Sequence, residues 1–170
     1  MWLQLHGRLL TADKLMQWGI TVDSRCCLCQ NHDETEEHLF VECQFPKAVW
    51  QKILHWMQRQ DVVRDYWDQH VQWVIQCAKG RSRGAQLYKM VYAEITHVMW
   101  IERNMKIFEK RSRGVDSIAQ ELPKKIDGPA LPSLIPFNCS RSSADVSNAD
   151  SPSTQIRNRK GEVYQFVSII

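Results

Sequence analysis

The segment that decides the fold reads Cys26-Cys27-Leu28-Cys29 and then Glu34-Thr35-Glu36-Glu37-His38-Leu39-Phe40-Val41-Glu42-Cys43. One choice of four residues has the spacing C-x2-C-x8-H-x4-C, namely Cys26, Cys29, His38 and Cys43. Three thiolates and one neutral imidazole complete a tetrahedral zinc shell. Because the chain supplies all four positions, no zinc-bound water remains to react. We therefore expect one structural Zn2+ ion, whose binding folds a segment too short to form its own core.

Two other residues of this segment are alternative ligands. Cys27 competes with Cys26, although adjacent residues usually point apart. His32 competes with His38, although it lies in a predicted loop without an apolar helix to fix its ring. A further alternative is that all of these are ordinary buried thiols. Three cysteines and a histidine at compatible spacing within eighteen residues favour the metal site.

Short helices are expected on both sides of the cysteines. Residues 11–18 begin with a typical N-cap, Thr11, and are followed by Gly19, a typical helix stop. Residues 35–42 predict a second short helix. After Pro46, apolar residues recur at the i, i+3, i+4, i+7 spacing of a helix. These residues are Trp50, Ile53, Leu54 and Met57.

Longer helical patterns follow at 61–78, 85–111 and 115–126. Three tryptophans beside patterned apolar residues are expected in the core. They are Trp18, Trp50 and Trp100. The predicted fold class is mostly α: a small zinc-stabilised helical domain with a long C-terminal helix pair and a disordered tail.

The chain divides into three predicted parts. Residues 1–58 form the zinc-binding domain and residues 59–128 a helical extension. Residues 129–170 are expected to be disordered, because prolines interrupt their first part and residues 138–160 contain no aromatic side chain to bury. The apolar end at 164–170 predicts a strand only if another segment pairs with it.

Composition excludes some classes of protein. No apolar run is long enough to span a membrane, and no signal peptide is expected. The six cysteines therefore indicate metal binding or free thiols rather than a disulfide framework. The net charge of +3 is too small to identify a nucleic-acid-binding protein by itself. It is unevenly spread, because residues 33–42 contain five acids, whereas residues 61–113 contain ten Lys/Arg against six Asp/Glu.

Two basic clusters are candidate phosphate contacts. Arg81 and Arg83 lie in a glycine-flanked loop, whose alternative is a flexible solvated loop. The second cluster contains Lys110, Arg111 and Arg113, whose alternative is a cationic helix end that complements the helix dipole.

Two other polar groups have more ordinary alternatives. Arg103 and Asn104 within the 85–111 helix could also touch nucleic acid, but hydrogen bonding between helices is favoured. No catalytic constellation is present. The regularly spaced acids Asp61, Asp65 and Asp68 are interleaved with Arg64 and suggest an ordinary polar helix face rather than a metal site.

The chain resembles the zinc-binding domain that follows the reverse transcriptase in plant LINE-type (non-LTR) retrotransposons. The resemblance rests on residues 8–15, on the cysteine segment together with Trp50, and on Trp100-Ile101-Glu102-Arg103-Asn104-Met105-Lys106-Ile107-Phe108, and it covers roughly residues 1–126. It implies that Cys26, Cys29, His38 and Cys43 are the ligands. The polymerase and ribonuclease H regions of such elements are missing, and the residues after Pro129 match nothing in the family. The resemblance thus implies a truncated, decayed element, or a gene model with an unrelated 3′ end.

Three functions are open. The resemblance implies a non-catalytic zinc module that assists RNA-template or target-DNA binding beside a reverse transcriptase domain, at an unspecified nuclear or cytoplasmic location. The first alternative is a zinc-folded scaffold that binds proteins and has no affinity for nucleic acid. The second is a functionless fragment of a decayed element. A salt titration distinguishes the first two, because phosphate contacts weaken steeply with salt.

Overall fold

The computed structural model describes residues 9–59 and 63–126 in full, and residues 153–157 and 163–167 as backbone. It confirms a mostly helical fold. Among the described residues, the first helix is the short α2 (Ala12–Gln17). The chain then crosses the cysteine loop and enters a π-helical turn, η1 (His38–Glu42). The helices α3 (Gln44–Trp56), α4 (Trp67–Ala78) and α5 (Arg83–Asn104) follow, and α5 runs into a second π-helical turn, η2 (Met105–Glu109). Helix α6 (Val115–Ile126) completes the helical part.

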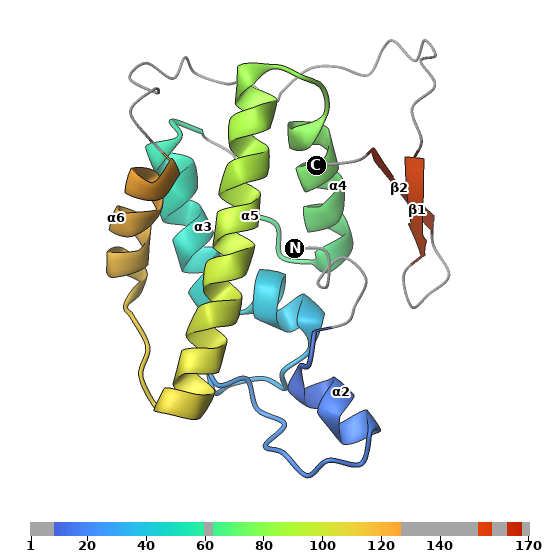
Figure 1. The fold of residues 1–170 in the computed structure, drawn as a ribbon, viewed down its shortest axis with the longest axis vertical. Helices are drawn as coiled ribbons and strands as arrows, with labels where there is room; N and C mark the ends of the chain where they lie inside the picture. Colours follow the sequence, from blue (N-terminus) through green and yellow to red (C-terminus); the bar gives the residue numbers. More distant parts are fainter. Residues whose placement is uncertain (1–8, 60–62, 127–152, 158–162, 168–170) are drawn as a thin grey trace.

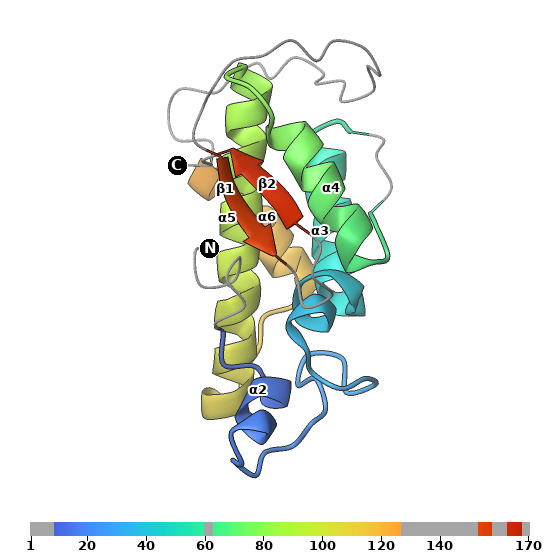
Figure 2. The same cartoon turned by 90° about the vertical axis from the view of Figure 1, so that its right-hand side faces the viewer.

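Helix α5 is the central element of the bundle. Its 22 residues make it about 33 Å long. In Figure 1, α3 and α6 lie on one side of α5 and α4 lies on the other, while α2 and the cysteine loop lie near the C-terminal end of α5. Figure 2 shows the same elongated arrangement from the side. The turn η1 contacts α3, α4 and α5 and so connects the cysteine segment to the bundle.

One hydrophobic cluster fills the bundle. It combines residues near the cysteine segment, such as Leu39 and Ile53, with residues of α5 and α6, such as Met99 and Leu122. The predicted stripe of α3 is confirmed, because Trp50, Ile53, Leu54 and Met57 are all buried. The boundary proposed between residues 58 and 59 stays a prediction.

An aromatic group forms the centre of this cluster. Trp50 packs edge-on against Trp73 at 5.7 Å between ring centroids and lies 6.2 Å from the ring of Tyr88. His70 is enclosed by the rings of Trp50, Trp73 and Tyr92. The burial of Trp50 is therefore as predicted.

The expectation for Trp18 is wrong. It lies at the C-terminal end of α2 and is 66% exposed. The reason is that α2 has only six residues, and Gly19 turns the chain away with φ of +78°. Trp100 is half-buried and packs against the core from α5.

The C-terminal segment contains an antiparallel pair of strands. Strand β1 (Ser153–Arg157) pairs with β2 (Val163–Val167), with Gln155 opposite Gln165. This differs from the disorder predicted for residues 129–170, because a partner strand supplies the pairing that residues 164–170 needed. Residues 127–152, 158–162 and 168–170 lie outside the described part. Among the described residues, no helix combines the length and apolar character of a membrane span.

Candidate metal centre

Four side chains converge beside the lower end of α5. Cys26, Cys29, His38 and Cys43 each offer one ligand atom, and all four atoms lie within 4.8 Å of one another. The Sγ atoms of Cys26 and Cys43 are 4.0 Å apart, and Cys29 Sγ is 3.3 Å from His38 Nε2. Zinc–sulfur bonds of about 2.3 Å in a tetrahedron separate two sulfurs by about 3.8 Å. The cluster is therefore positioned to bind one zinc ion.

A tight turn holds the first two cysteines. The backbone N–H of Cys26 donates to the carbonyl of His32 at 2.8 Å, and the N–H of Gln30 donates to the carbonyl of Cys26 at 2.8 Å. Gln30 has a φ of +62°, which reverses the chain directly after Cys29. These bonds place both thiols on one side of the turn.

The π-helical turn η1 brings the other two ligands together. In an α-helix, residues five positions apart lie about 140° from each other around the axis. Here the N–H of Cys43 donates to the carbonyl of His38 at 2.8 Å, which is the wider i to i+5 ring. The chain then leaves the turn at Cys43, whose ψ is 140°, and α3 begins at the next residue. The wider turn lets both side chains face the same point.

The electrostatics of the cluster suit a dication. A hydrogen bond with Cys43 lowers the pKa of the Cys26 thiol to about 4. Burial acts in the opposite direction, and a hydrogen bond with His38 lowers this pKa further. The same bond raises the pKa of Cys43, and the bond with Cys26 raises the pKa of His38. Protons are thus shared among Cys26, Cys43 and His38, and a metal ion that displaces these protons releases them to solvent.

The chemistry of the donor set points to zinc. Cys26 and Cys43 are fully buried, and both are free thiols. Their sulfurs are too far apart for a disulfide, whose S–S bond is about 2.05 Å. Three soft sulfur donors with one imidazole match the closed tetrahedral set of structural zinc.

The two alternative ligands lie elsewhere. Cys27 points away from the cluster, with its Sγ atom 3.7 Å from the carbonyl of Arg103 and 4.0 Å from Glu34 Oε2. Burial, together with the charge of Glu34, raises the pKa of Cys27 to about 12, which keeps it a neutral thiol. His32 is exposed, and its ring centroid lies 5.3 Å from that of His38. Neither residue belongs to the group of four.

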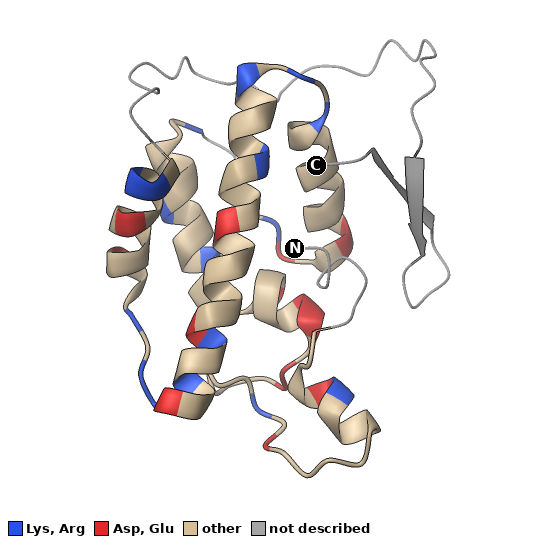
Figure 3. Ribbon diagram, in the orientation of Figure 1, with Lys and Arg blue, Asp and Glu red and all other residues tan. Residues whose placement is uncertain are grey.

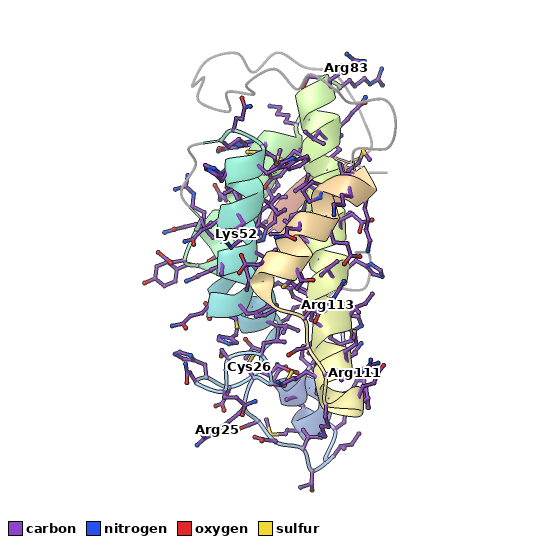
Figure 4. All side chains as sticks on the ribbon, turned by 90° about the vertical axis from the view of Figure 1, so that its left-hand side faces the viewer. Arg25, Cys26, Lys52, Arg83, Arg111 and Arg113 are labelled. Carbon is purple, nitrogen blue, oxygen red and sulfur yellow. The ribbon has the colours of Figure 1, made fainter. Side chains whose placement is uncertain are left out.

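The basic residues proposed for phosphate contact lie at both ends of α5. Arg81 and Arg83 are exposed where α5 begins, whereas Lys110 and Arg111 are exposed just beyond its C-terminal end. Figure 4 shows Arg83 at one end of the helix and Arg111 at the other. Arg111 pairs with Glu109. The two clusters are therefore separate surfaces.

Arg113 serves a structural contact instead. Its Nε donates to Glu102 Oε1 at 2.6 Å, its backbone N–H donates to Glu102 Oε2 at 2.8 Å, and it also pairs with Glu121. Glu102 is fully buried, and its hydrogen bond raises the pKa of Arg113. The positive charge of the guanidinium thus balances the charge of a buried carboxylate. Arg113 is therefore paired within the protein rather than available to a phosphate group.

Arg103 and Asn104 also have structural contacts, but these lie with the cysteine loop and within α5 rather than between two helices, the arrangement favoured above. Arg103 forms a buried ion pair with Glu34, and its Nη1 donates to Asn104 Oδ1 at 3.1 Å. The guanidinium also lies over the ring of Trp100 at 5.1 Å. Asp61 lies outside the described residues. Asp65 pairs with Lys47 across an exposed 2.8 Å contact.

Comparison with known proteins agrees with the geometry. Residues 1–50 match the family model described as zinc-binding in reverse transcriptase. The matched residues contain all four ligands and end at Trp50, and the family is a zinc-binding domain rather than a catalytic one. Searches of curated proteins and of solved structures found no match.

Proposed function

We propose that the chain is a non-catalytic module, folded by one zinc ion, that binds the phosphate backbone of RNA or DNA beside a reverse transcriptase domain. The observation that carries the proposal is the complete cluster of Cys26, Cys29, His38 and Cys43 inside the part that matches a reverse-transcriptase zinc-binding family. We propose a plant LINE-type retrotransposon as its source.

The loop before α5 supports the phosphate contact. Lys79, Arg81 and Arg83 are exposed there, and among the described residues none of the three forms an ion pair. The N-terminal end of α5 adds the positive end of its helix dipole to the same surface. Among the described residues, Figure 3 shows basic residues and no acidic ones at this end of the bundle. A polyanion would therefore meet an uncompensated positive surface.

The surface beside the metal is unsuited to phosphate. Asp33, Glu37 and Glu42 are exposed around the cluster. Their charges repel a nucleic-acid backbone, so the zinc centre acts through folding and the contact lies at the far end of α5. Arg113 leaves the set of proposed contacts because Glu102 and Glu121 bind it.

A salt titration tests the contact. We would measure binding of a single-stranded RNA to the full chain and to the double variant Arg81→Gln/Arg83→Gln between low and physiological salt. Each lost contact lowers the slope of log affinity against log salt by about 0.7, so the double variant should lose about 1.4. The matched control is Lys124→Gln/Lys125→Gln, which removes the same charge from exposed positions of α6. Equal slopes in all three proteins would refute the contact.

A protein-binding scaffold is the second candidate. Four large apolar residues around α2 are exposed: Leu10, Met16, Trp18 and Ile20. Apolar groups gathered in this way are typical of protein contacts. Binding of a partner protein with an affinity that does not depend on salt, and that is lost in Trp18→Ser, would favour this candidate. A functionless fragment of a decayed element would show neither behaviour.

A further inference from the structure

A buried ion pair joins the zinc loop to α5. Glu34 lies between the ligands Cys29 and His38 and is 1% exposed. Its Oε1 accepts from Arg103 Nη2 at 2.7 Å and from Arg103 Nε at 3.2 Å. Arg103 is 69 residues further along the chain and is 5% exposed. We call this contact the Glu34–Arg103 bridge.

The bridge also fixes the loop on its other sides. Glu34 Oε1 accepts from the backbone N–H of Ala12 at 3.0 Å, at the start of α2. The backbone N–H of Glu34 donates to the carbonyl of Ser24 at 2.7 Å, and its carbonyl accepts from Asp13 N–H at 3.3 Å. Every polar group of Glu34 is thus bonded, and three segments meet there.

Cys27 connects the bridge to the first metal ligand. Its Sγ atom lies against both partners of the bridge, 4.0 Å from Glu34 Oε2 and 3.7 Å from the carbonyl of Arg103. The adjacent residue is the ligand Cys26. The loop therefore presents one cysteine to the metal and the next one to α5.

We propose that Arg103 is a positioning residue for the metal centre. Through Glu34 it holds the loop of residues 23–34 in the conformation that brings Cys26 and Cys29 to the zinc ion. Metal binding and the docking of α5 consequently stabilise each other, because linkage between two events is reciprocal. This inference rests on the zinc-binding half of the proposed function and is independent of nucleic acid.

The physical reason is that the loop's own hydrogen bonds, such as those of Cys26 with His32 and Gln30, stay within the loop and do not attach it to α5. The loop lies outside the helices, so ordering it against the bundle costs conformational entropy. A guanidinium that donates two bonds to one buried carboxylate fixes both position and orientation. Removing either partner leaves the other charge buried and uncompensated.

Zinc affinity of the full chain, measured by competition with a chromophoric chelator, tests the proposal. Arg103→Met and Glu34→Gln should each weaken zinc binding by about 10- to 100-fold, the usual effect of losing a group that orients metal ligands. The double variant should bind no more weakly than the worse single variant, because both remove one contact.

The matched control is Arg113→Met. It removes the same side-chain group from another ion pair to α5, the pair with Glu102, which touches no loop residue. Its zinc affinity should fall only as far as its loss of unfolding free energy accounts for, because metal binding and folding are linked, whereas the affinity of Arg103→Met should fall further than its own loss of stability. An equal loss of zinc affinity for an equal loss of stability in Arg113→Met and Arg103→Met would overturn the proposal, because general destabilisation would then explain both.

Cobalt substitution separates positioning from ligand loss. At saturating Co2+, Arg103→Met should keep the tetrahedral thiolate spectrum of the unchanged chain, since all four ligands remain. If Arg103→Met does not fold, Arg103→Lys, which keeps the charge but loses the two-bonded geometry, should weaken metal binding to a smaller extent.

Two results would overturn the coupling. Unchanged zinc affinity in Arg103→Met would overturn the coupling and leave the zinc-binding function standing. If Arg103→Met does not fold, unchanged affinity in Arg103→Lys would have the same meaning. A chain that binds no zinc at all would overturn the coupling and the zinc-binding half of the proposed function together.

Discussion

Neighbouring side chains at the metal centre are distinguished by the direction in which the backbone points them. Cys26 and Cys27 are adjacent, yet the first faces His38 and Cys43 while the second faces Glu34 and Arg103. His38 is buried in η1, whereas His32 is exposed in the loop. Residue type alone therefore leaves the choice of ligands open, and the turn at residues 26–30 decides it.

Removal of a ligand should abolish metal binding. We expect Cys29→Ser and His38→Ala to lose the zinc ion and, with it, the helical circular-dichroism signal, since zinc contributes about 10–16 kcal/mol to the folding of small zinc peptides. Metal content and melting temperature are the measurements. The matched controls Cys27→Ser and His32→Ala should retain one ion per chain. A His38→Ala protein with the original melting temperature in a chelator would contradict the structural role.

His70 makes stability depend on pH. It is 2% exposed among Trp50, Trp73 and Tyr92, and burial lowers its pKa from 6.5 to about 4. Between these pH values the unfolded chain binds more protons than the folded one, so the free energy of unfolding falls as the pH falls from 6.5 to 4. The loss is at most about 3 kcal/mol.

The His70 effect is isolated by comparison with His70→Phe. Metal ligands also take up protons in acid, so both proteins are unfolded by denaturant at saturating zinc across this pH range. The unfolding free energy of His70→Phe should fall less steeply than that of the unchanged chain. Parallel profiles would show that His70 does not contribute.

The helices owe their limits to particular contacts. Ser82 is the N-cap of α5, and its hydroxyl accepts a hydrogen bond from the N–H of Ala85 at 3.2 Å. At its other end the helix widens into η2 and stops at Lys110, which has a φ of +55°. Helix α2 is capped from a distance, because the carboxylate of Glu34 accepts from the N–H of Ala12. Local and distant caps therefore both operate in this chain.

Loss of the α5 cap should destabilise the fold modestly. We expect Ser82→Ala to lower the free energy of unfolding by about 1 kcal/mol, because the N–H of Ala85 loses its acceptor. Urea unfolding at saturating zinc measures the change. The control Ser112→Ala, at an exposed position outside the helices, should change stability by less than about 0.5 kcal/mol. Equal effects at the two positions would contradict the capping role.

The molecule as a whole shares one hydrophobic cluster between the metal segment and the bundle. Leu39 and Val41 of η1 are buried in the same cluster as Val91 and Ile95 of α5. The Glu34–Arg103 bridge adds a polar contact between the same two regions. Loss of the metal is therefore expected to disturb helices that contain none of its ligands.

Zinc removal should unfold residues 9–126 in one transition. As chelator is added, the helical signal of α4 to α6 and the fluorescence of the buried tryptophans should be lost together, and restored zinc should recover both. The reason is that η1 contacts α3, α4 and α5. Hydrogen exchange provides an independent check. Persistent protection of α5 and α6 in the metal-free chain would show instead that the bundle folds alone.

The sequence by itself determined that a zinc site lies in residues 26–43, and it determined most of the helices. The spacing of Cys26, Cys29, His38 and Cys43 predicts such a site because zinc chemistry admits few donor combinations. The periodic apolar residues of α3, α5 and α6 predict these helices because a helix buries one face. Both signals lie within short stretches of the sequence.

Only the tertiary structure decided the roles of single polar and aromatic residues. The sequence favours a contact between helices for Arg103 and predicts a phosphate contact for Arg113. Instead, Arg103 meets Glu34 of the cysteine loop and Arg113 meets Glu102. Trp18 has the pattern of a core residue and is exposed, because α2 is too short to cover it. Partners 11 to 69 residues apart depend on how the helices pack, and no local pattern records that packing.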